Sequence, residues 1–220
     1  MRNFIILSTF ACLMFSSCNS EEPIYSCDQT ENEWVKENLS DIQTMSRSEW
    51  VNMDEHLKIP VYRAFTQKQK LDFWISKFKD VLSLNWNDAE REHISSLIEM
   101  IKEQAPVLDG YEKLSDEEKN EFDLFFYKWF ETSRETFKWN DKLIYGIIAS
   151  GNTLLDKEGN LSISNNRMTN LSYTESNCNC STRSDWCTPS NVYCESTSCS
   201  TTSGCGTMFV YDCNGRCGGI

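Results

Sequence analysis

Apolar side chains recur every three or four positions through the middle of the chain, which is the spacing of one face of an α-helix. The clearest stripe covers residues 66–84, and a second covers residues 89–101. A third spans residues 115–130, and a shorter one spans residues 143–148. Weaker helical patterns cover residues 30–55. These patterns predict a series of amphipathic helices.

Helix boundaries are marked by residues that satisfy free backbone groups. Thr66 with Gln69, and Ser115 with Glu118, have the spacing of a capping box, in which each side chain accepts a hydrogen bond from the backbone N–H of the other residue. The last pattern ends at Gly151, a residue type common just after a helix. Two helices therefore have well-defined predicted starts.

Each apolar stripe needs a partner face, and no strand-like alternation offers a sheet. We therefore expect a mainly α fold, an irregular bundle of four to six helices over residues 30–151. The aromatic stripes alternatively line a ligand groove, although amphipathic helices of this kind need partner faces simply to be stable.

The amino terminus has the pattern of an export signal. Arg2 is followed by an apolar run from Phe4 to Phe15, which is shorter than the roughly 20 residues that span a bilayer. Ser16-Ser17-Cys18 then resembles a lipoprotein processing site. We expect residues 1–17 to be removed and Cys18 to carry lipid. The alternative is an ordinary secretory signal cut elsewhere, which would leave Cys18 without lipid.

The residues after Cys18 indicate where in the cell the protein is delivered. Asn19-Ser20-Glu21-Glu22 resembles the acidic tether of lipoproteins sent to the cell surface. We expect an outer-membrane lipoprotein, exposed on the cell surface, with residues 18–29 as the lipid-anchored tether.

Charge narrows the choice of partners. The formal net charge is −12 at pH 7, and residues 18–177 carry nearly all of it. Such a surface repels phosphate, so we expect no nucleic-acid partner. No basic membrane-binding stripe occurs either, which leaves the lipid as the expected membrane contact.

Beyond the helices the composition changes twice. Residues 152–177 are rich in Asn, Ser and Thr, and contain the turn signal Lys157-Glu158-Gly159-Asn160. We expect a polar linker there, with room for one small hairpin, and the easiest site for a protease to cut. Residues 178–220 form a separate cysteine-rich module, expected to hold little regular structure.

Eight of the eleven cysteines lie in this tail, and their density in an exported chain predicts a disulfide framework. A module of this size buries too little apolar surface to be stable without crosslinks. The sequence does not choose among the 105 pairings that eight cysteines allow. Zinc ligation and thioether bridges are competing accounts, but the tail lacks His and repeated CxxC pairs. The framework cysteines are Cys178, Cys180, Cys187, Cys194, Cys199, Cys205, Cys213 and Cys217.

Cys27 is left over, because Cys12 leaves with the signal and Cys18 is lipidated. We expect it to be an unpaired thiol in the tether, with pairing between two chains as the alternative.

Catalytic and metal chemistry have no support in the sequence. His56 and His93 are the two histidines, and neither has a ligand partner nearby. The acidic residues alternate with Lys on polar helix faces, and no nucleophile and base can be paired. We therefore expect no enzyme activity, no cofactor and no metal; turnover by the helical domain would reverse this.

The tail resembles a known family. The runs CNCSTRSDWC and CSTTSGCGTMFVYDCNGRC resemble the fulvocin C-related bacteriocins, and residues 59–74 and 137–151 are similar to the long precursors of that family. The resemblance implies a bacteriocin-like protein whose tail, either attached or released, contacts the envelope of neighbouring bacteria. The other reading is a non-toxic surface lipoprotein with a disulfide-rich binding or adhesion module.

The strip Met208, Phe209, Val210 and Tyr211 is the candidate target contact. Alternation along a strand puts one pair of these side chains on each face, so that one pair can be buried while the other meets a target. Alternatively all four fill the small core of the tail.

Overall fold

The structure is a computed structural model that describes residues 23–162, 178–187 and 192–219. The signal peptide expected at residues 1–17, the lipidation site Cys18 and the acidic residues that follow it lie outside the described residues. So does the predicted linker from residue 163 onward.

The fold is mainly helical, as the sequence predicts, but it has more helices than the expected four to six. The described residues form eight α-helices, four short helical turns and two strands. In chain order these are α1 (Gln29–Glu37), α2 (Leu39–Ile42), α3 (Arg47–Val51), α4 (Glu55–Ala64), α5 (Gln67–Leu82), α6 (Asp88–Glu103), η1 (Ala105–Asp109), η2 (Tyr111–Lys113), α7 (Asp116–Glu131), η3 (Thr132–Thr136), α8 (Asp141–Ile148), β1 (Val192–Cys205), η4 (Thr207–Phe209) and β2 (Tyr211–Gly219).

The helix starts follow from capping. The boxes expected at Thr66 and Ser115 are both present at the first residues of α5 and α7. Two further boxes were not predicted: Ser46 with Glu49 at the start of α3, and Asn87 with Glu90 at the start of α6. In each box a side chain satisfies a backbone N–H that the helix leaves free.

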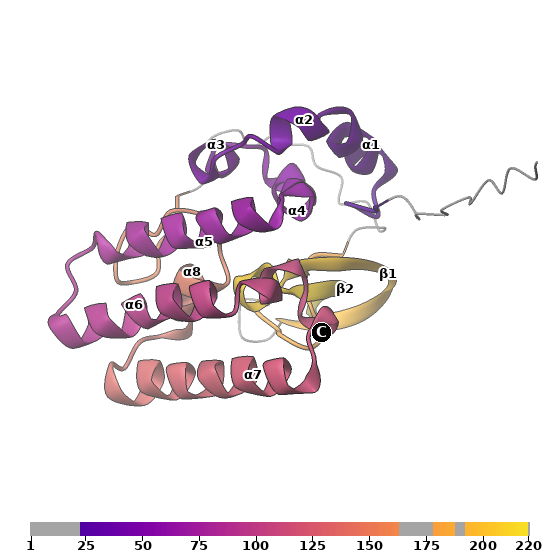
Figure 1. The fold of residues 1–220 in the computed structure, drawn as a ribbon. Helices are drawn as coiled ribbons and strands as arrows, with labels where there is room; N and C mark the ends of the chain where they lie inside the picture. Colours follow the sequence, from indigo (N-terminus) through magenta and orange to yellow (C-terminus); the bar gives the residue numbers. More distant parts are fainter. Residues whose placement is uncertain (1–22, 163–177, 188–191, 220) are drawn as a thin grey trace, which may run out of the picture.

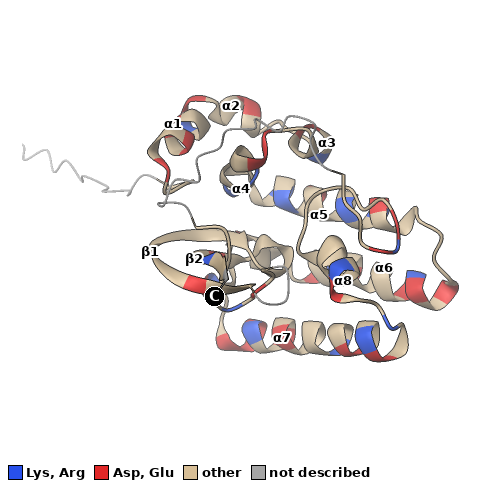
Figure 2. Ribbon diagram, turned by 180° about the vertical axis from the view of Figure 1, so that it is seen from behind, with Lys and Arg blue, Asp and Glu red and all other residues tan. Residues whose placement is uncertain are grey.

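Helices α5, α6 and α7 lie roughly side by side, and α1 to α4 lie on the α5 side of them (Figure 1). Their facing stripes are buried as the periodicity predicts: Trp74, Phe78, Ile94, Leu97 and Phe122 are fully shielded from solvent. Acidic and basic residues occupy the outer faces of these helices, whereas the strands carry few charges (Figure 2).

The start of the predicted linker belongs to the core. Leu154 is buried, and it pairs with Leu161 across the small turn that the sequence indicated. Three buried cations hold the chain just before it. Arg47 donates to the Gly151 carbonyl, Lys77 to the Asn152 carbonyl, and Lys58 to the Asn152 side chain. The expectation of an easily cut linker from residue 152 is therefore wrong for residues 152–154.

The tail has more regular structure than expected. Strands β1 and β2 pair antiparallel from Val192 opposite Gly219 to Cys205 opposite Tyr211, forming a two-stranded sheet that we call the cystine ribbon. The ribbon lies between α4 and the start of α7 (Figure 1), with β1 packed on α4 and β2 on η2. The expectation of little regular structure in the tail is wrong.

Candidate functional site

The predicted target-contact strip is buried. Met208 and Val210 are fully shielded, and Phe209 and Tyr211 are 6% and 9% exposed. All four belong to the same apolar core as the helices. The expectation that one pair faces a target is therefore wrong, because helix side chains surround the strip. The alternative, in which the four residues fill a core, is correct, but that core belongs mainly to the helices.

Phe209 makes the closest link between ribbon and helices. Its ring centroid lies 5.1 Å from that of Tyr62 and 5.2 Å from that of Trp74, both edge-on. Tyr211 stacks on Tyr111 at 4.8 Å, and the Tyr111 amide donates to the Val210 carbonyl over 2.8 Å. Edge-on and offset rings of this kind add to the stabilisation that burial provides.

The turn that carries Phe209 is strained. Met208 and Phe209 both have positive φ, at 52° and 56°, a conformation that costs a residue with a side chain about 1–2 kcal/mol. Such conformations persist where the surroundings fix them. Here the aromatic residues of α4 and α5 hold Phe209 in place, so the turn depends on the helices for its shape.

The disulfide framework includes all but one of the predicted cysteines. Four disulfides form among the described residues: Cys180–Cys194, Cys187–Cys217, Cys205–Cys213 and Cys27–Cys199.

Two expectations about these cysteines are wrong. Cys27 is bonded to the tail rather than unpaired, and Cys178 is the free thiol of the described residues. The eight tail cysteines therefore do not pair only with one another. The physical reason is spatial: the N-terminal segment runs beside the ribbon, which no spacing along the sequence reveals.

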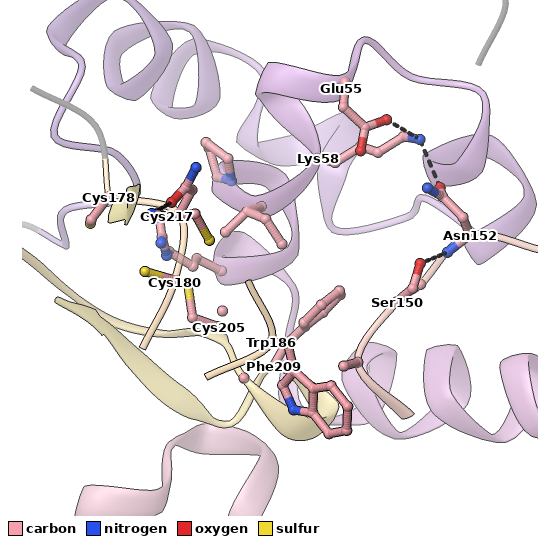
Figure 3. Close-up of a pocket in the computed structure, with 18 of the residues that line it drawn as sticks. Glu55, Lys58, Ser150, Asn152, Cys178, Cys180, Trp186, Cys205, Phe209 and Cys217 are labelled. Atoms are coloured by element: carbon pink, nitrogen blue, oxygen red, sulfur yellow. Dashed lines mark hydrogen bonds and ion pairs between the residues drawn. The ribbon is translucent and has the colours of Figure 1, made fainter. Parts of the chain in front are cut away.

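A pocket of about 510 Å³ opens between the helices and the ribbon. Helix α4 and the loop after α8 form one wall, and the ribbon turn with residues 178–187 forms the other. Figure 3 shows Glu55, Lys58 and Asn152 on one side, with Trp186 and Phe209 opposite. Aromatic walls with a few convergent polar groups are typical of small-molecule sites.

The polar side of this pocket is ordered before any ligand enters. The Lys58 ammonium is buried and donates to Glu55 at 2.9 Å and to Asn152 at 2.8 Å. It also lies 5.3 Å from the centre of the Trp50 ring. Burial raises the pKa of Tyr145, whose side chain lines the same pocket, so the phenol is neutral at pH 7.

Arg63 joins three parts of the chain. From α4 it donates to the Tyr25 carbonyl at 2.6 Å and to the Ser203 carbonyl at 3.0 Å. Burial lowers its pKa to about 10, while attraction to Cys178, Glu31 and Asp212 opposes that shift. Its Nη2 has no hydrogen-bond partner among the described residues. The sequence analysis missed Arg63, and only its place inside an apolar helix stripe signalled a buried cation.

Cysteines come close enough to hold a metal in two places. One group is Cys27, Cys178 and Cys199, and the other is Cys180, Cys187 and Cys194. All of these except Cys178 are in disulfides, and a disulfide sulfur is not a thiolate ligand. The histidines lie apart: His56 lines the pocket, while His93 stacks on Trp129 between α6 and α7.

No protein family, curated protein or solved structure matches this chain in the comparisons with known proteins. Within the described ranges, no helix combines the length and the apolar composition that crossing a bilayer needs. The geometry of the pocket and the ribbon therefore carries the functional argument.

Proposed function

We propose that this chain is an exported, lipid-anchored surface protein that binds a small ligand between its helices and its cystine ribbon. The observation that carries the proposal is the position of Phe209. One face of its turn completes the core of the helices, and the residue also lines the pocket. The ribbon is thereby a fixed wall of the site rather than a detachable part.

The lining favours an aromatic or apolar ligand that bears a polar group. Trp186, Phe209 and Tyr145 supply flat apolar surface, and Lys58 and Asn152 supply hydrogen-bonding groups on the opposite side. The Trp186 indole donates to the Thr207 hydroxyl at 3.1 Å, which fixes its ring against the ribbon turn. A rigid aromatic wall loses little conformational entropy when a ligand binds.

Export and lipid anchoring complete the proposal, and both are supported by the pattern of residues 1–18. Disulfides accumulate in oxidising compartments outside the cytoplasm, and four of them fit an exported protein. Intact-mass measurement of protein recovered from cells tests both statements. We expect a mass that lacks residues 1–17 and includes diacylglycerol, and a Cys18→Ala chain that carries no lipid. An unprocessed, unlipidated chain would refute the anchor.

A bacteriocin-like activity is the second candidate. The cysteine spacing of the tail supports it through the family resemblance, and Tyr193 on the outer end of the ribbon is 45% exposed. In this account the outer end of the ribbon, rather than the buried strip, contacts the envelope of a neighbouring bacterium. The whole chain is tested for growth inhibition of related strains, and a Tyr193→Ala chain should lose the activity. Absence of inhibition by the oxidised full chain would exclude this candidate.

Ligand binding is tested with 8-anilinonaphthalene-1-sulfonate, an aromatic anion whose fluorescence rises in apolar sites. We expect saturable binding of one probe per chain. Trp186→Ala removes an aromatic wall and should weaken binding about tenfold, equivalent to about 1.4 kcal/mol. Tyr127→Ala is the matched control, because Tyr127 is an aromatic residue on α7 that is 60% exposed. It should leave the affinity unchanged.

Near-ultraviolet circular dichroism confirms that both variants keep their tertiary packing, since loosely packed chains also bind this probe. Equal affinities for the two variants would refute the pocket as the binding site. So would binding that does not saturate at one probe per chain.

A further inference from the structure

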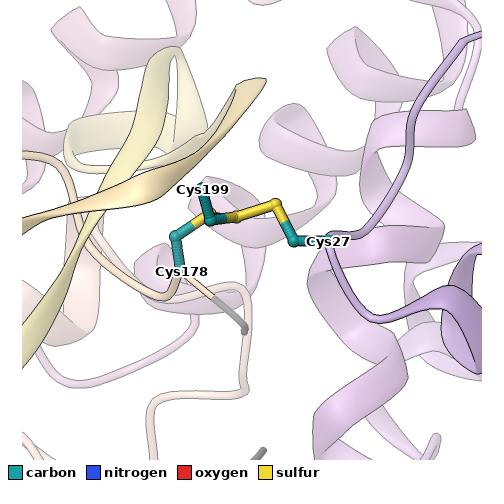
Figure 4. Close-up of side chains that lie close together, drawn as sticks. All are labelled: Cys27, Cys178 and Cys199. Atoms are coloured by element: carbon teal, nitrogen blue, oxygen red, sulfur yellow. A yellow bond between two sulfur atoms is a disulfide. The ribbon is translucent and has the colours of Figure 1, made fainter. Parts of the chain in front are cut away.

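Three sulfur atoms from distant parts of the chain meet beside the ribbon (Figure 4). Cys27 is bonded to Cys199. The free thiol of Cys178 lies 2.9 Å from the Cys199 sulfur, and all three sulfurs lie within 4.8 Å of one another. Cys199 is therefore in contact with its bonded partner and with a second candidate partner at the same time.

The ribbon backbone explains why Cys199 reaches this position. Between Ser196 and Thr201, β1 advances five positions while β2 advances two, from Gly215 to Cys213. The extra residues bulge out of the ladder and carry Cys199 away from the pairing strand. A bulge re-aims side chains in this way, so Cys199 faces the N-terminal segment instead of a ribbon cysteine.

The surroundings of Cys178 suit a reactive sulfur that small reagents reach poorly. Its residue is 5% exposed, and its sulfur lies 3.7 Å from the Thr201 hydroxyl. Attraction to Cys178 is the largest of the charge interactions that oppose the lowering of the Arg63 pKa by burial. The thiolate is the form of a cysteine that attacks disulfides.

We propose that Cys178, Cys199 and Cys27 form an intramolecular thiol–disulfide exchange site, in which Cys199 alternates between the other two as its partner. The Cys178 thiolate attacks the Cys199 sulfur, the Cys178–Cys199 bond forms, and the Cys27–Cys199 bond breaks. Cys27 leaves as a thiolate and takes up the proton that Cys178 gave up. One disulfide and one thiol are present before and after, so no external oxidant or reductant is needed.

The exchange changes what the ribbon is fastened to. With Cys27 bonded, the ribbon is tied covalently to the N-terminal segment just before α1. With Cys178 bonded, the eight tail cysteines pair only with one another, and the half-buried Cys27 carries the thiol. Arg63 then remains the link between the N-terminal segment and the ribbon, through the Tyr25 and Ser203 carbonyls. This inference does not depend on the proposed ligand site.

The test is disulfide mapping of the full chain purified without reductant. Samples held at pH 6 and pH 8.5 are quenched in acid, alkylated with N-ethylmaleimide under denaturing conditions, digested and analysed by mass spectrometry. We expect both the Cys27–Cys199 and the Cys178–Cys199 peptides, with label divided between Cys178 and Cys27. Samples moved from pH 6 and from pH 8.5 to the same final pH should reach the same ratio of the two pairings. The Cys205–Cys213 peptide is the internal control and should stay constant.

Label confined to Cys178 at every pH would overturn the proposal, because it would mean that Cys27 never leaves. Two variants provide a separate check. Cys27→Ser, held in a glutathione redox buffer whose disulfide form is the oxidant, should form the Cys178–Cys199 bond and leave no thiol in residues 23–220. Cys178→Ser in the same buffer should retain only Cys27–Cys199. A Cys27→Ser chain with thiols at both Cys178 and Cys199 would also overturn it.

Discussion

Along α5, apolar residues recur through the whole helix and pack against α6, whereas in the cystine ribbon the degree of burial changes along its length. From Val192 to Ser200 the β1 residues are exposed or half-buried, and from Ser203 to Cys205 they are buried. Two disulfides, Cys180–Cys194 and Cys187–Cys217, hold the exposed end. The buried end has one disulfide, Cys205–Cys213, and also packs on helix side chains.

This difference shows that crosslinks and burial contribute in different proportions along one small sheet. A two-stranded sheet alone is marginal in water, and the outer end is joined to residues 178–187, where Cys180 bridges Gly215, rather than to a helix. The inner end has a helical partner face, because Phe209 and Tyr211 pack on aromatic residues of the helices. The ribbon is therefore stable only as part of the whole molecule.

The largest effect is expected from Phe209→Ala. Removing a buried Phe typically costs about 3–5 kcal/mol, and here the cavity would open between the ribbon and α4 and α5. Urea unfolding followed by tryptophan fluorescence measures the loss, since Trp50 and Trp74 report on the same cluster. Tyr193→Ala, at the exposed end of the ribbon, should change stability by less than about 0.5 kcal/mol. Equal, small effects would show that ribbon and helices are independent units.

A smaller effect is expected at the exposed end. Replacing Cys187 and Cys217 by Ser removes a crosslink that spans 30 residues, and should lower the free energy of unfolding by about 2–4 kcal/mol. Because the helices do not depend on this bond, their far-ultraviolet circular dichroism should persist. Trypsin should then cut at Arg183 or Arg216 sooner than in the parent chain. Unchanged cleavage would mean that pairing alone orders the outer end.

Much of the helical part was predictable because its determinants are local. Capping boxes and the spacing of apolar residues act within one or two turns, so Thr66 and Ser115 mark helix starts in the sequence and in the structure. The ribbon was not predictable in the same way. Whether Phe209 faces a target or a core depends on α4 and α5, more than 120 positions away.

The cysteine-rich site shows the same limit. Density of cysteines predicts disulfides, because exported small modules need them, but pairing depends on which segments meet in space. Cys27 is 172 positions from Cys199, and no spacing rule covers that distance. The pocket was missed for a related reason: Lys58 and Trp186 come from the two regions that the sequence analysis treated as separate domains.

The smallest expected effect is a change in stability with pH, which should involve the helical part and not the ribbon. His93 lies in the helical part, with its ring stacked on Trp129 at 4.7 Å and its Nε2 2.9 Å from the Ser133 hydroxyl. Burial lowers its pKa to about 4, below the value of about 6.5 that an unfolded chain has. Between these values the unfolded state binds the extra proton.

The stability that neutral His93 provides is therefore complete above pH 6.5 and is lost as the pH falls towards 4. The side chain is only partly buried, so after allowing for solvent screening we expect a loss of about 1–2 kcal/mol in this window. His93→Gln keeps a polar side chain that does not titrate, and urea unfolding at several pH values measures the difference between the two chains. Their stability curves should diverge below pH 6.5, whereas parallel curves would mean that the pKa of His93 is the same in the folded and unfolded states. The disulfides Cys180–Cys194 and Cys187–Cys217 do not titrate, so disulfide mapping should find both bonds in the same samples at every pH.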